Sequence, residues 1–121
     1  MQDKDKPLWR SMLYVPATSE KFIEKAHERG ADAIKIDLED AVAPKEKDTA
    51  RKLVKDAAQL VSRGSADVLV RINRPLRMAV ADIESSIWPE VCGLVLPKVD
   101  SADQINSVSY THLRAHETPI N

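Results

Sequence analysis

Charged side chains alternate with apolar ones through residues 33–39 of this 121-residue chain. Such alternation predicts a β-strand, because successive strand residues point to opposite faces. Lys35, Asp37 and Glu39 then share one face, and the other face is aliphatic. Carboxylates and an ammonium group in one row can bind anions or metal-bound water. We therefore expect this face to line a site rather than a core.

Two later apolar runs also carry charge close to their ends. Arg71 lies near the end of the third run, with Asn73 expected on the same face, and Lys98 lies near the end of the fourth. In adjacent parallel strands, Glu39, Arg71 and Lys98 would meet on one side at the carboxyl edge of the sheet. Cations beside a carboxylate can bind an anionic substrate and stabilise charge that develops on an oxygen. A solvated or purely structural ion network is the competing interpretation.

The elements that would position these residues alternate between strands and helices. The apolar runs, each interpreted as a strand, are 11–15, 33–38, 67–72 and 93–99. The first helix is expected to begin at an N-cap, Thr18 or Ser19, and to end before Gly30. The second is expected to begin near Pro44 and to end before Gly64. The third is expected from Met78 to Ile87, with Pro89 ending it.

Apolar residues at helical spacing mark the helix faces expected to pack on the sheet. They are Phe22, Ile23 and Ala26 in the first helix and Leu53, Val54, Ala57, Ala58 and Val61 in the second. Glu46, Lys47 and Asp48 at the start of the second helix are expected to form a solvated face.

Alternating strands and helices predict a parallel sheet, either doubly wound or closed into a barrel. A doubly wound nucleotide-binding sheet usually has a glycine-rich first turn, but the first turn here is VPATSEK and the chain has only three glycines. The sequence therefore favours an α/β fold of the barrel type, with about four βα units in this chain.

Composition narrows the class of partner. Lys and Arg (18) nearly balance Asp and Glu (19), and no basic stretch indicates nucleic acid or an anionic membrane. The single cysteine, Cys92, excludes an intramolecular disulfide. The polar first ten residues lack the apolar core of a signal peptide. We expect a cytoplasmic protein that binds a small molecule.

Four segments carry a family resemblance: RSMLYVPATSEKFIEKA, GADAIKIDLEDAVAPKEKDTAR, VLVRIN and GLVLPKVDSADQI. In this order and spacing they resemble the N-terminal half of citrate lyase β-subunit-like proteins of the HpcH/HpaI aldolase/citrate lyase family. The resemblance covers about residues 8–106, and the DLEDAVAP and VRIN segments are its most specific parts. It implies that the chain is the N-terminal half, about four βα units, of a (β/α)8 TIM barrel.

The resemblance implies a Mg²⁺-dependent carbon–carbon lyase that acts on a 3-hydroxyacyl-CoA such as citryl-CoA, malyl-CoA or citramalyl-CoA. The products would be acetyl-CoA and a 2-oxo acid, and the full-length protein would be a homo-oligomer. An aldolase on free 2-oxo acids and a malyl-CoA thioesterase are alternatives within the family. A non-catalytic binding module is the alternative from another class.

The resemblance also implies roles for individual residues. Arg71 would be the catalytic cation that holds a substrate carboxylate or thioester oxygen, with Tyr14 as a further substrate contact. Lys25 matches a basic position that some relatives use near the CoA phosphates, although a solvated helix lysine is the stronger interpretation.

The acidic residues would act on the metal indirectly. Glu39 and Asp40 would orient metal-bound water and Arg71, and Lys98 would support the site or the barrel. The direct metal ligands are expected on later strands, beyond this chain, so that the chain alone is expected to be an inactive fragment.

The last fifteen residues, 107–121, are expected to be a non-native tail after a domain at 1–106. His112 and His116 lie one helical turn apart beside Glu117, but zinc-binding helices place the glutamate between the histidines. The segment 108–118 instead matches a translation of the transposase adapter used in sequencing libraries, and we expect its histidines to bind no metal.

Overall fold

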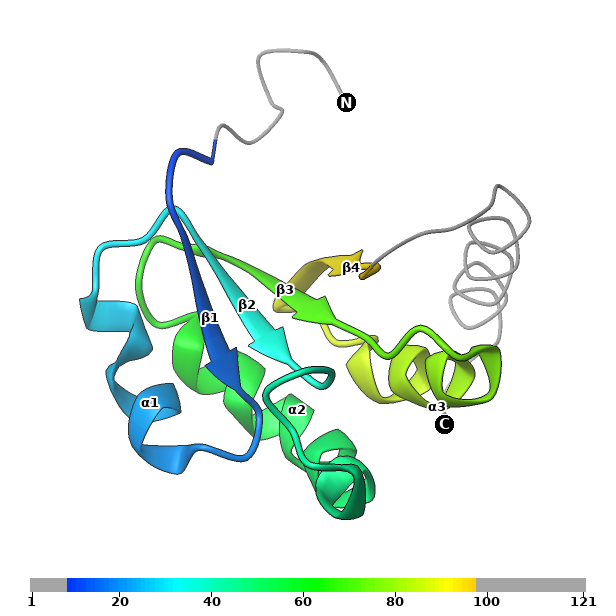
Figure 1. Cartoon of the computed structure of the whole chain (residues 1–121). Helices are drawn as coiled ribbons and strands as arrows, with labels where there is room; N and C mark the ends of the chain where they lie inside the picture. The colour runs from blue at the N-terminus through cyan, green and yellow to red at the C-terminus, as the bar shows by residue number, and fades with distance from the viewer. Residues whose placement is uncertain (1–8, 98–121) are drawn as a thin grey trace, which may run out of the picture.

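The structure, a computed structural model, describes residues 9–97 as four strands and three α-helices in strict alternation (Figure 1). The elements are β1 (Met12–Pro16), α1 (Glu20–Lys25), the 3-10 helix η2 (Ala26–Glu28), β2 (Ala33–Asp37), the 3-10 helix η3 (Pro44–Glu46), α2 (Lys47–Val61), β3 (Asp67–Arg71), α3 (Leu76–Ser86) and β4 (Val91–Val95).

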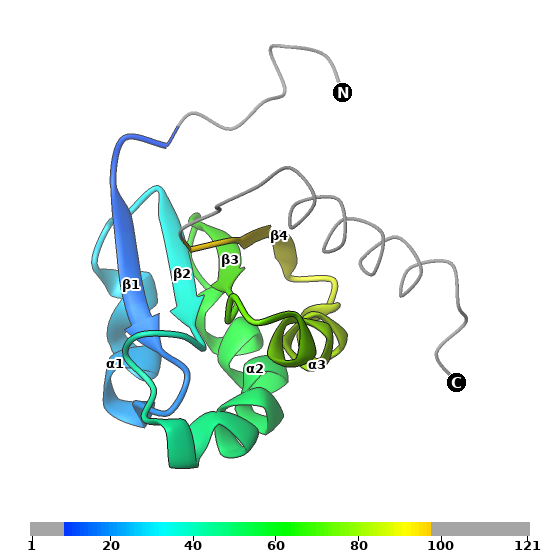
Figure 2. The ribbon, with the colours of Figure 1, turned by 45° about the vertical axis from the view of Figure 1, so that its right-hand side comes forward.

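The four strands form one parallel sheet in the order β1-β2-β3-β4. Figures 1 and 2 show the helices together on one side of this sheet. In a doubly wound sheet the helices cover both faces and the strand order reverses within the sheet. In a barrel each strand lies next to the preceding one in the sequence, and all helices lie on the outer face. The described part of the chain is thus an α/β unit consistent with the N-terminal part of a TIM barrel, as the sequence predicts.

The predicted elements agree with the observed ones to within about two residues, except at β4. That strand ends at Val95, where a run to Val99 was predicted, and Val99 lies outside the described residues. The third helix begins at Leu76 rather than Met78 because Pro75, which cannot donate a backbone hydrogen bond, occupies the N-cap position.

The core lies between the helices and the aliphatic face of the sheet. Ile34, Ile36, Val70 and Ile72 are fully buried, as are Val54, Ala58 and Val61 of α2. Two predicted core residues are exposed instead: Phe22 retains 53% and Leu53 38% of its accessible surface. Phe22 directly precedes the buried Ile23, and Leu53 directly precedes the buried Val54. Consecutive residues of an α-helix point about 100° apart around the helix axis, so both exposed side chains lie at the edge of the buried helix face.

On the opposite face of the sheet, Gly93 of β4 lies beside Leu69 of β3. A Cβ atom on Gly93 would lie 2.9 Å from Cδ2 of Leu69, its register partner on β3. Gly93 therefore leaves room for Leu69 on this face. No helix among residues 9–97 combines the length and the apolar character that crossing a membrane requires.

Candidate active site

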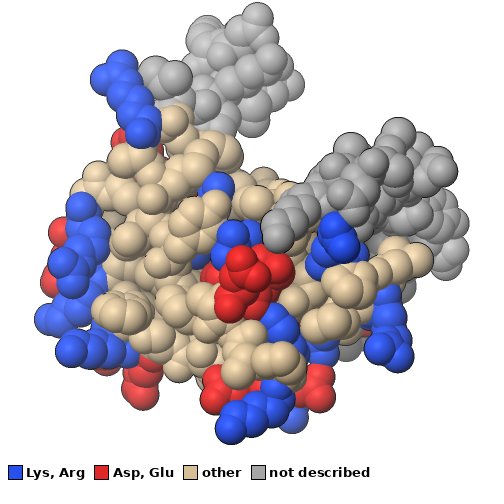
Figure 3. All heavy atoms as spheres, viewed as in Figure 1, with Lys and Arg blue, Asp and Glu red and all other residues tan. Residues whose placement is uncertain are grey.

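Strand register gathers the polar residues of the face away from the helices. Tyr14 of β1 pairs with Lys35 of β2, and Asp37, two residues further along β2, pairs with Arg71 of β3. Since parallel strands end at the same edge, these side chains converge near the carboxyl end of the sheet. Figure 3 shows acidic side chains at this place, with basic ones around them.

Asp37 and Arg71 form a two-pronged ion pair. The Arg71 Nε and Nη2 atoms donate to the two carboxylate oxygens of Asp37 at 2.9 and 2.7 Å. The Asp37 side chain is 1% exposed and that of Arg71 is 20% exposed. Asp37 uses two of the five N–H donors of the guanidinium, and Nη1 carries donors that this carboxylate does not engage.

The same pairing sets the charge of both groups. Burial alone would raise the pKa of Asp37, but hydrogen bonds from Arg71 and from the backbone amides of Glu39 and Ala41 outweigh it, and the pKa lies below its ordinary value. The hydrogen bonds to Asp37 likewise raise the pKa of Arg71. Both groups are therefore ionised at neutral pH, and the guanidinium is a permanent cation in the site.

Asp37 also shapes the turn that follows β2. Its oxygens accept hydrogen bonds from the backbone amides of Glu39 at 2.9 Å and Ala41 at 3.0 Å. This turn places the Glu39 carboxylate 3.7 Å from Nε of Arg71, at ion-pair distance, and leaves Asp40 exposed. Asp37 is therefore the main residue that orients Arg71, ahead of Glu39 and Asp40. The sequence predicted Asp37 only as part of the charged face.

Tyr14 lies between two cations. The Lys35 Nζ atom donates to the Tyr14 hydroxyl at 3.0 Å and lies 4.8 Å from the ring centroid. The guanidinium carbon of Arg71 lies 4.6 Å from the same centroid. These distances permit cation–π attraction on both contacts. The predicted substrate contact Tyr14 is thus beside the predicted catalytic cation.

Lys47 holds the turn after β2 from the helix side, although a solvated position was predicted. Its Nζ atom donates to the carbonyl oxygens of Leu38 at 2.9 Å and Glu39 at 2.5 Å. The 3-10 helix Pro44–Glu46 places Lys47 at the start of α2, next to the end of β2. Sequence reasoning missed this role because a first-turn lysine has the same local pattern whether it is solvated or bonded.

Asn73 lines a hollow of about 220 Å³ together with Glu39, but its side-chain amide bonds inward and does not contact the charged face as predicted. Strand β3 ends at Arg71, so the alternation stops before Asn73. The Asn73 side-chain amide donates to the Leu38 carbonyl oxygen at 2.9 Å and to the fully buried Asp82 carboxylate at 2.6 Å. Arg51 of α2 pairs with the other oxygen of Asp82 at 2.6 Å. Asn73 thus belongs to a buried network that ties α2 and α3 to the end of β2.

Lys25 is not brought to this cluster. Lys25 is exposed in the last turn of α1, in the layer of helices. Because a helix that joins parallel strands runs back along the sheet, this turn lies toward the amino end of the strands. Lys98 and the tail at 107–121 lie outside the described residues.

Oxygen ligands suit Mg²⁺, and the carboxylates of Glu39 and Asp40 have the right chemistry to contact its bound waters. Among residues 9–97, however, no three His, Cys, Asp or Glu side chains lie together as a metal site would require. The described residues therefore fit a supporting role toward a metal, and they do not form a ligand set.

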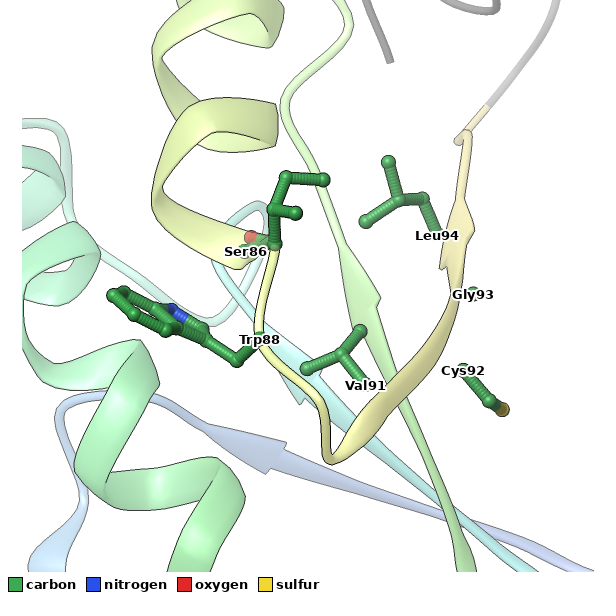
Figure 4. A pocket seen from close by; sticks show the side chains of 7 residues that line it. Ser86, Trp88, Val91, Cys92, Gly93 and Leu94 are labelled. Carbon is green, nitrogen blue, oxygen red and sulfur yellow. The ribbon is translucent and has the colours of Figure 1, made fainter. Parts of the chain in front are cut away.

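Cys92 does not add a nucleophile. It follows Val91 in β4, beside a hollow of about 210 Å³ at the end of α3. Figure 4 shows the Cys92 thiol pointing away from Val91 and Leu94, and Trp88 pointing toward α2. Partial burial and the nearby Asp67 carboxylate raise the pKa of this thiol, which keeps it protonated at neutral pH.

Parallel βα units with polar residues gathered at the carboxyl end of the strands form an α/β unit consistent with the N-terminal part of a TIM barrel. The sequence profile of the HpcH/HpaI aldolase/citrate lyase family matches residues 10–120. The chain belongs to this family, whose citrate lyase β-subunit members make it a family of lyase-type enzymes, as the sequence resemblance predicts.

Three curated relatives illustrate the range of activities. The chain is 38% identical over 102 residues to a (3S)-malyl-CoA thioesterase of Cereibacter sphaeroides and, also over 102 residues, 38% identical to the citrate lyase subunit beta of Leuconostoc mesenteroides. It is 35% identical over 106 residues to the citrate lyase subunit beta of Escherichia coli. The alignments cover 84%, 84% and 87% of this chain but only 36%, 34% and 35% of the relatives. The chain thus spans about a third of the length of these relatives.

Proposed function

We propose that the full-length protein is a Mg²⁺-dependent carbon–carbon lyase acting on a 3-hydroxyacyl-CoA such as citryl-CoA, malyl-CoA or citramalyl-CoA. The observation that carries the proposal is the half-buried Arg71 guanidinium, which Asp37 holds in a fixed orientation at the carboxyl end of the strands. The similarity to citrate lyase β-subunits supports the same activity.

In the proposed reaction a base removes the proton of the 3-hydroxyl group. The C2–C3 bond breaks, a carbonyl forms at C3, and the electron pair of the broken bond moves to the thioester as an enolate that is then protonated to acetyl-CoA. The 2-oxo acid is the other product. Negative charge grows on oxygen during this step, and a preorientated cation stabilises it without reorganisation.

Arg71 would donate from Nη1 to the substrate carboxylate or to the thioester oxygen, while Asp37 keeps the guanidinium plane fixed. Tyr14 would pack against the substrate beside Arg71. A bound Mg²⁺ would add Lewis acidity at the substrate oxygens. Glu39 and Asp40 would contact its waters, and Lys98 would support the site. Lys25, exposed in the layer of helices and away from Arg71, would act as a solvated surface lysine instead of a contact for a CoA phosphate.

A malyl-CoA thioesterase is the second candidate, because a protein of that name is 38% identical to this chain. An aldolase on free 2-oxo acids and a non-catalytic binding module are further alternatives. The proposal includes a cytoplasmic location and homo-oligomeric assembly of the full-length protein.

Product analysis of the full-length protein separates these candidates. A lyase releases acetyl-CoA and a 2-oxo acid from citryl-CoA, citramalyl-CoA or malyl-CoA in the presence of Mg²⁺. A thioesterase releases free CoA and leaves the hydroxy acid intact, and a binding module releases neither. Absence of acetyl-CoA from all three substrates would overturn the lyase proposal.

The residue assignment is tested separately with Arg71→Ala and Arg71→Lys. Loss of one oxyanion-stabilising donor costs roughly 100-fold or more in turnover. Lysine keeps the charge but cannot make the two-pronged contact with Asp37, so we expect both variants to be strongly impaired. Near wild-type turnover in both would remove Arg71 from the reaction.

A further inference from the structure

Lys35 is the one charged residue of the β2 face that the proposed reaction does not use. It lies two residues before Asp37, on the same face, which places it about 6–7 Å deeper along the strand than the Asp37–Arg71 pair. Its neighbours on the sheet are Tyr14 of β1 and Leu69 of β3. The Lys35 side chain is only partly buried, so its ammonium group remains accessible to a ligand.

The described residues give Lys35 a polar partner but no carboxylate. The next residue of β2 on the same face, Asp37, is fully engaged by Arg71 and two backbone amides. Within residues 9–97, the contacts of the Lys35 ammonium group are with the hydroxyl and the ring of Tyr14. The phenol oxygen is neutral when protonated, so it orients the ammonium group without cancelling its charge.

Two cations therefore flank one aromatic ring. Tyr14 is 46% exposed, and Arg71 contacts the same ring. Asp37 and Glu39 balance the charge of Arg71, whereas the contacts of Lys35 among the described residues include no carboxylate. An anion beside Tyr14 would therefore be attracted to the Lys35 ammonium group and could also accept from Nη1 of Arg71. A ligand with a single carboxylate would satisfy only one of them.

We propose that Lys35 forms a second carboxylate subsite, next to that of Arg71, and that it selects substrates with two free carboxylates. The inference rests on the proposed function. Citryl-CoA and citramalyl-CoA form the discriminating pair, because the branch at C3 ends in a carboxymethyl group in the first and in a methyl group in the second. Arg71 holds the carboxylate on C3, which both substrates have, and Lys35 binds the extra carboxylate of citryl-CoA.

The test compares kcat/KM for citryl-CoA and citramalyl-CoA in the full-length protein and in Lys35→Met. Methionine keeps the unbranched shape and removes the charge. A hydrogen bond between charged groups contributes enough for its loss to lower the citryl-CoA to citramalyl-CoA ratio about 10- to 100-fold. We expect Lys35→Arg to retain most of the preference, since its charge remains.

Lys55→Met is the matched control. Lys55 also lies over an aromatic ring, with Nζ 5.2 Å from the centroid of Trp88, but it belongs to the outer helix α2. Its removal should leave the ratio unchanged. An equal ratio in wild type and Lys35→Met would overturn the inference, whatever happens to stability.

Calorimetry distinguishes failure of this inference from failure of the proposed lyase function. Oxaloacetate and pyruvate differ by the same carboxylate, and their binding needs no turnover. A selective loss of oxaloacetate affinity in Lys35→Met would support the subsite even if no thioester is cleaved. Equal losses for both acids, or no binding of either acid to the wild type, would refute it.

Discussion

Asp37 and Arg71 are direct register partners on the neighbouring parallel strands β2 and β3, and two N–H···O contacts of 2.9 and 2.7 Å join their side chains. Their relative position is therefore set by the sheet itself and not by a loop. The backbone continues this link, because the Leu38 amide donates to the Arg71 carbonyl oxygen at 2.9 Å. A cation that must meet developing charge in one place benefits from such a rigid mount.

Asp37→Asn should weaken both stability and activity. The amide cannot accept from Nε and Nη2 of Arg71 as a carboxylate does, and it leaves a half-buried guanidinium without its main partner. We expect a loss of about 1–3 kcal/mol in the free energy of unfolding, measured by denaturant titration of the full-length protein. We also expect a lower kcat. The exposed Asp40→Asn is the control for stability, and an equal effect of both changes would show that the ion pair contributes nothing specific.

The contribution of Asp37 to the free energy of unfolding should be lost at low pH and should not change at neutral pH. Its pKa is lower in the folded state than in the unfolded chain. The stabilisation is therefore complete above the unfolded value of about 3.9 and is lost as pH falls through the folded value. The stability difference between wild type and Asp37→Asn should be constant from pH 7 to about pH 5 and should shrink below about pH 4. A difference that shrinks instead between pH 5 and 7 would contradict this assignment.

Alternation along residues 33–39 was sufficient to predict which face of β2 is charged, because one face had to pack against helices. It did not predict the partner of Arg71. By pattern, Asp37 and Glu39 are equivalent, and only the end of β2 at Asp37 separates them. Asp37 stays in the sheet opposite Arg71, whereas Glu39 enters a turn and reaches 3.7 Å.

Asn73 and Lys47 escaped prediction for a related reason. The alternation of β3 was extended two residues past its end, and the acceptors of Lys47 are backbone carbonyls that no side-chain pattern reveals. The sequence did contain two signals for these roles. Asn73 follows shortly after a predicted strand, and Lys47 lies in the first helical turn after Pro44. Their partners depend on how the helices cross the strand ends, which local sequence does not determine.

Glu39→Gln should raise the Mg²⁺ concentration needed for half-maximal activity of the full-length protein. Glu39 is half-buried beside Arg71, where its charge can orient metal-bound water, and losses of such indirect contacts commonly weaken metal affinity about 10- to 100-fold. The measurement is a Mg²⁺ titration of the initial rate at saturating substrate. An unchanged titration curve, together with unchanged kcat, would return Glu39 to a purely structural role.

Lys47→Met should loosen the turn that carries Glu39 and Asp40. The ammonium group donates to the carbonyl oxygens of Leu38 and Glu39, and the Leu38 oxygen keeps a second donor, Asn73, after the change. Loss of these bonds should cost about 1–2 kcal/mol of unfolding free energy. Lys52→Met, an exposed position on the same helix, should remain within about 0.5 kcal/mol of wild type.

The activity readout of Lys47→Met separates a role in positioning the turn from a role in stability alone. If Lys47 holds Glu39 beside Arg71, the variant should need more Mg²⁺ than wild type even at a temperature where it is fully folded. The double variant with Glu39→Gln should then need little more Mg²⁺ than Glu39→Gln alone, because both changes disturb one contact. Independent, additive effects on the Mg²⁺ requirement would show that Lys47 stabilises the fold without positioning the carboxylate.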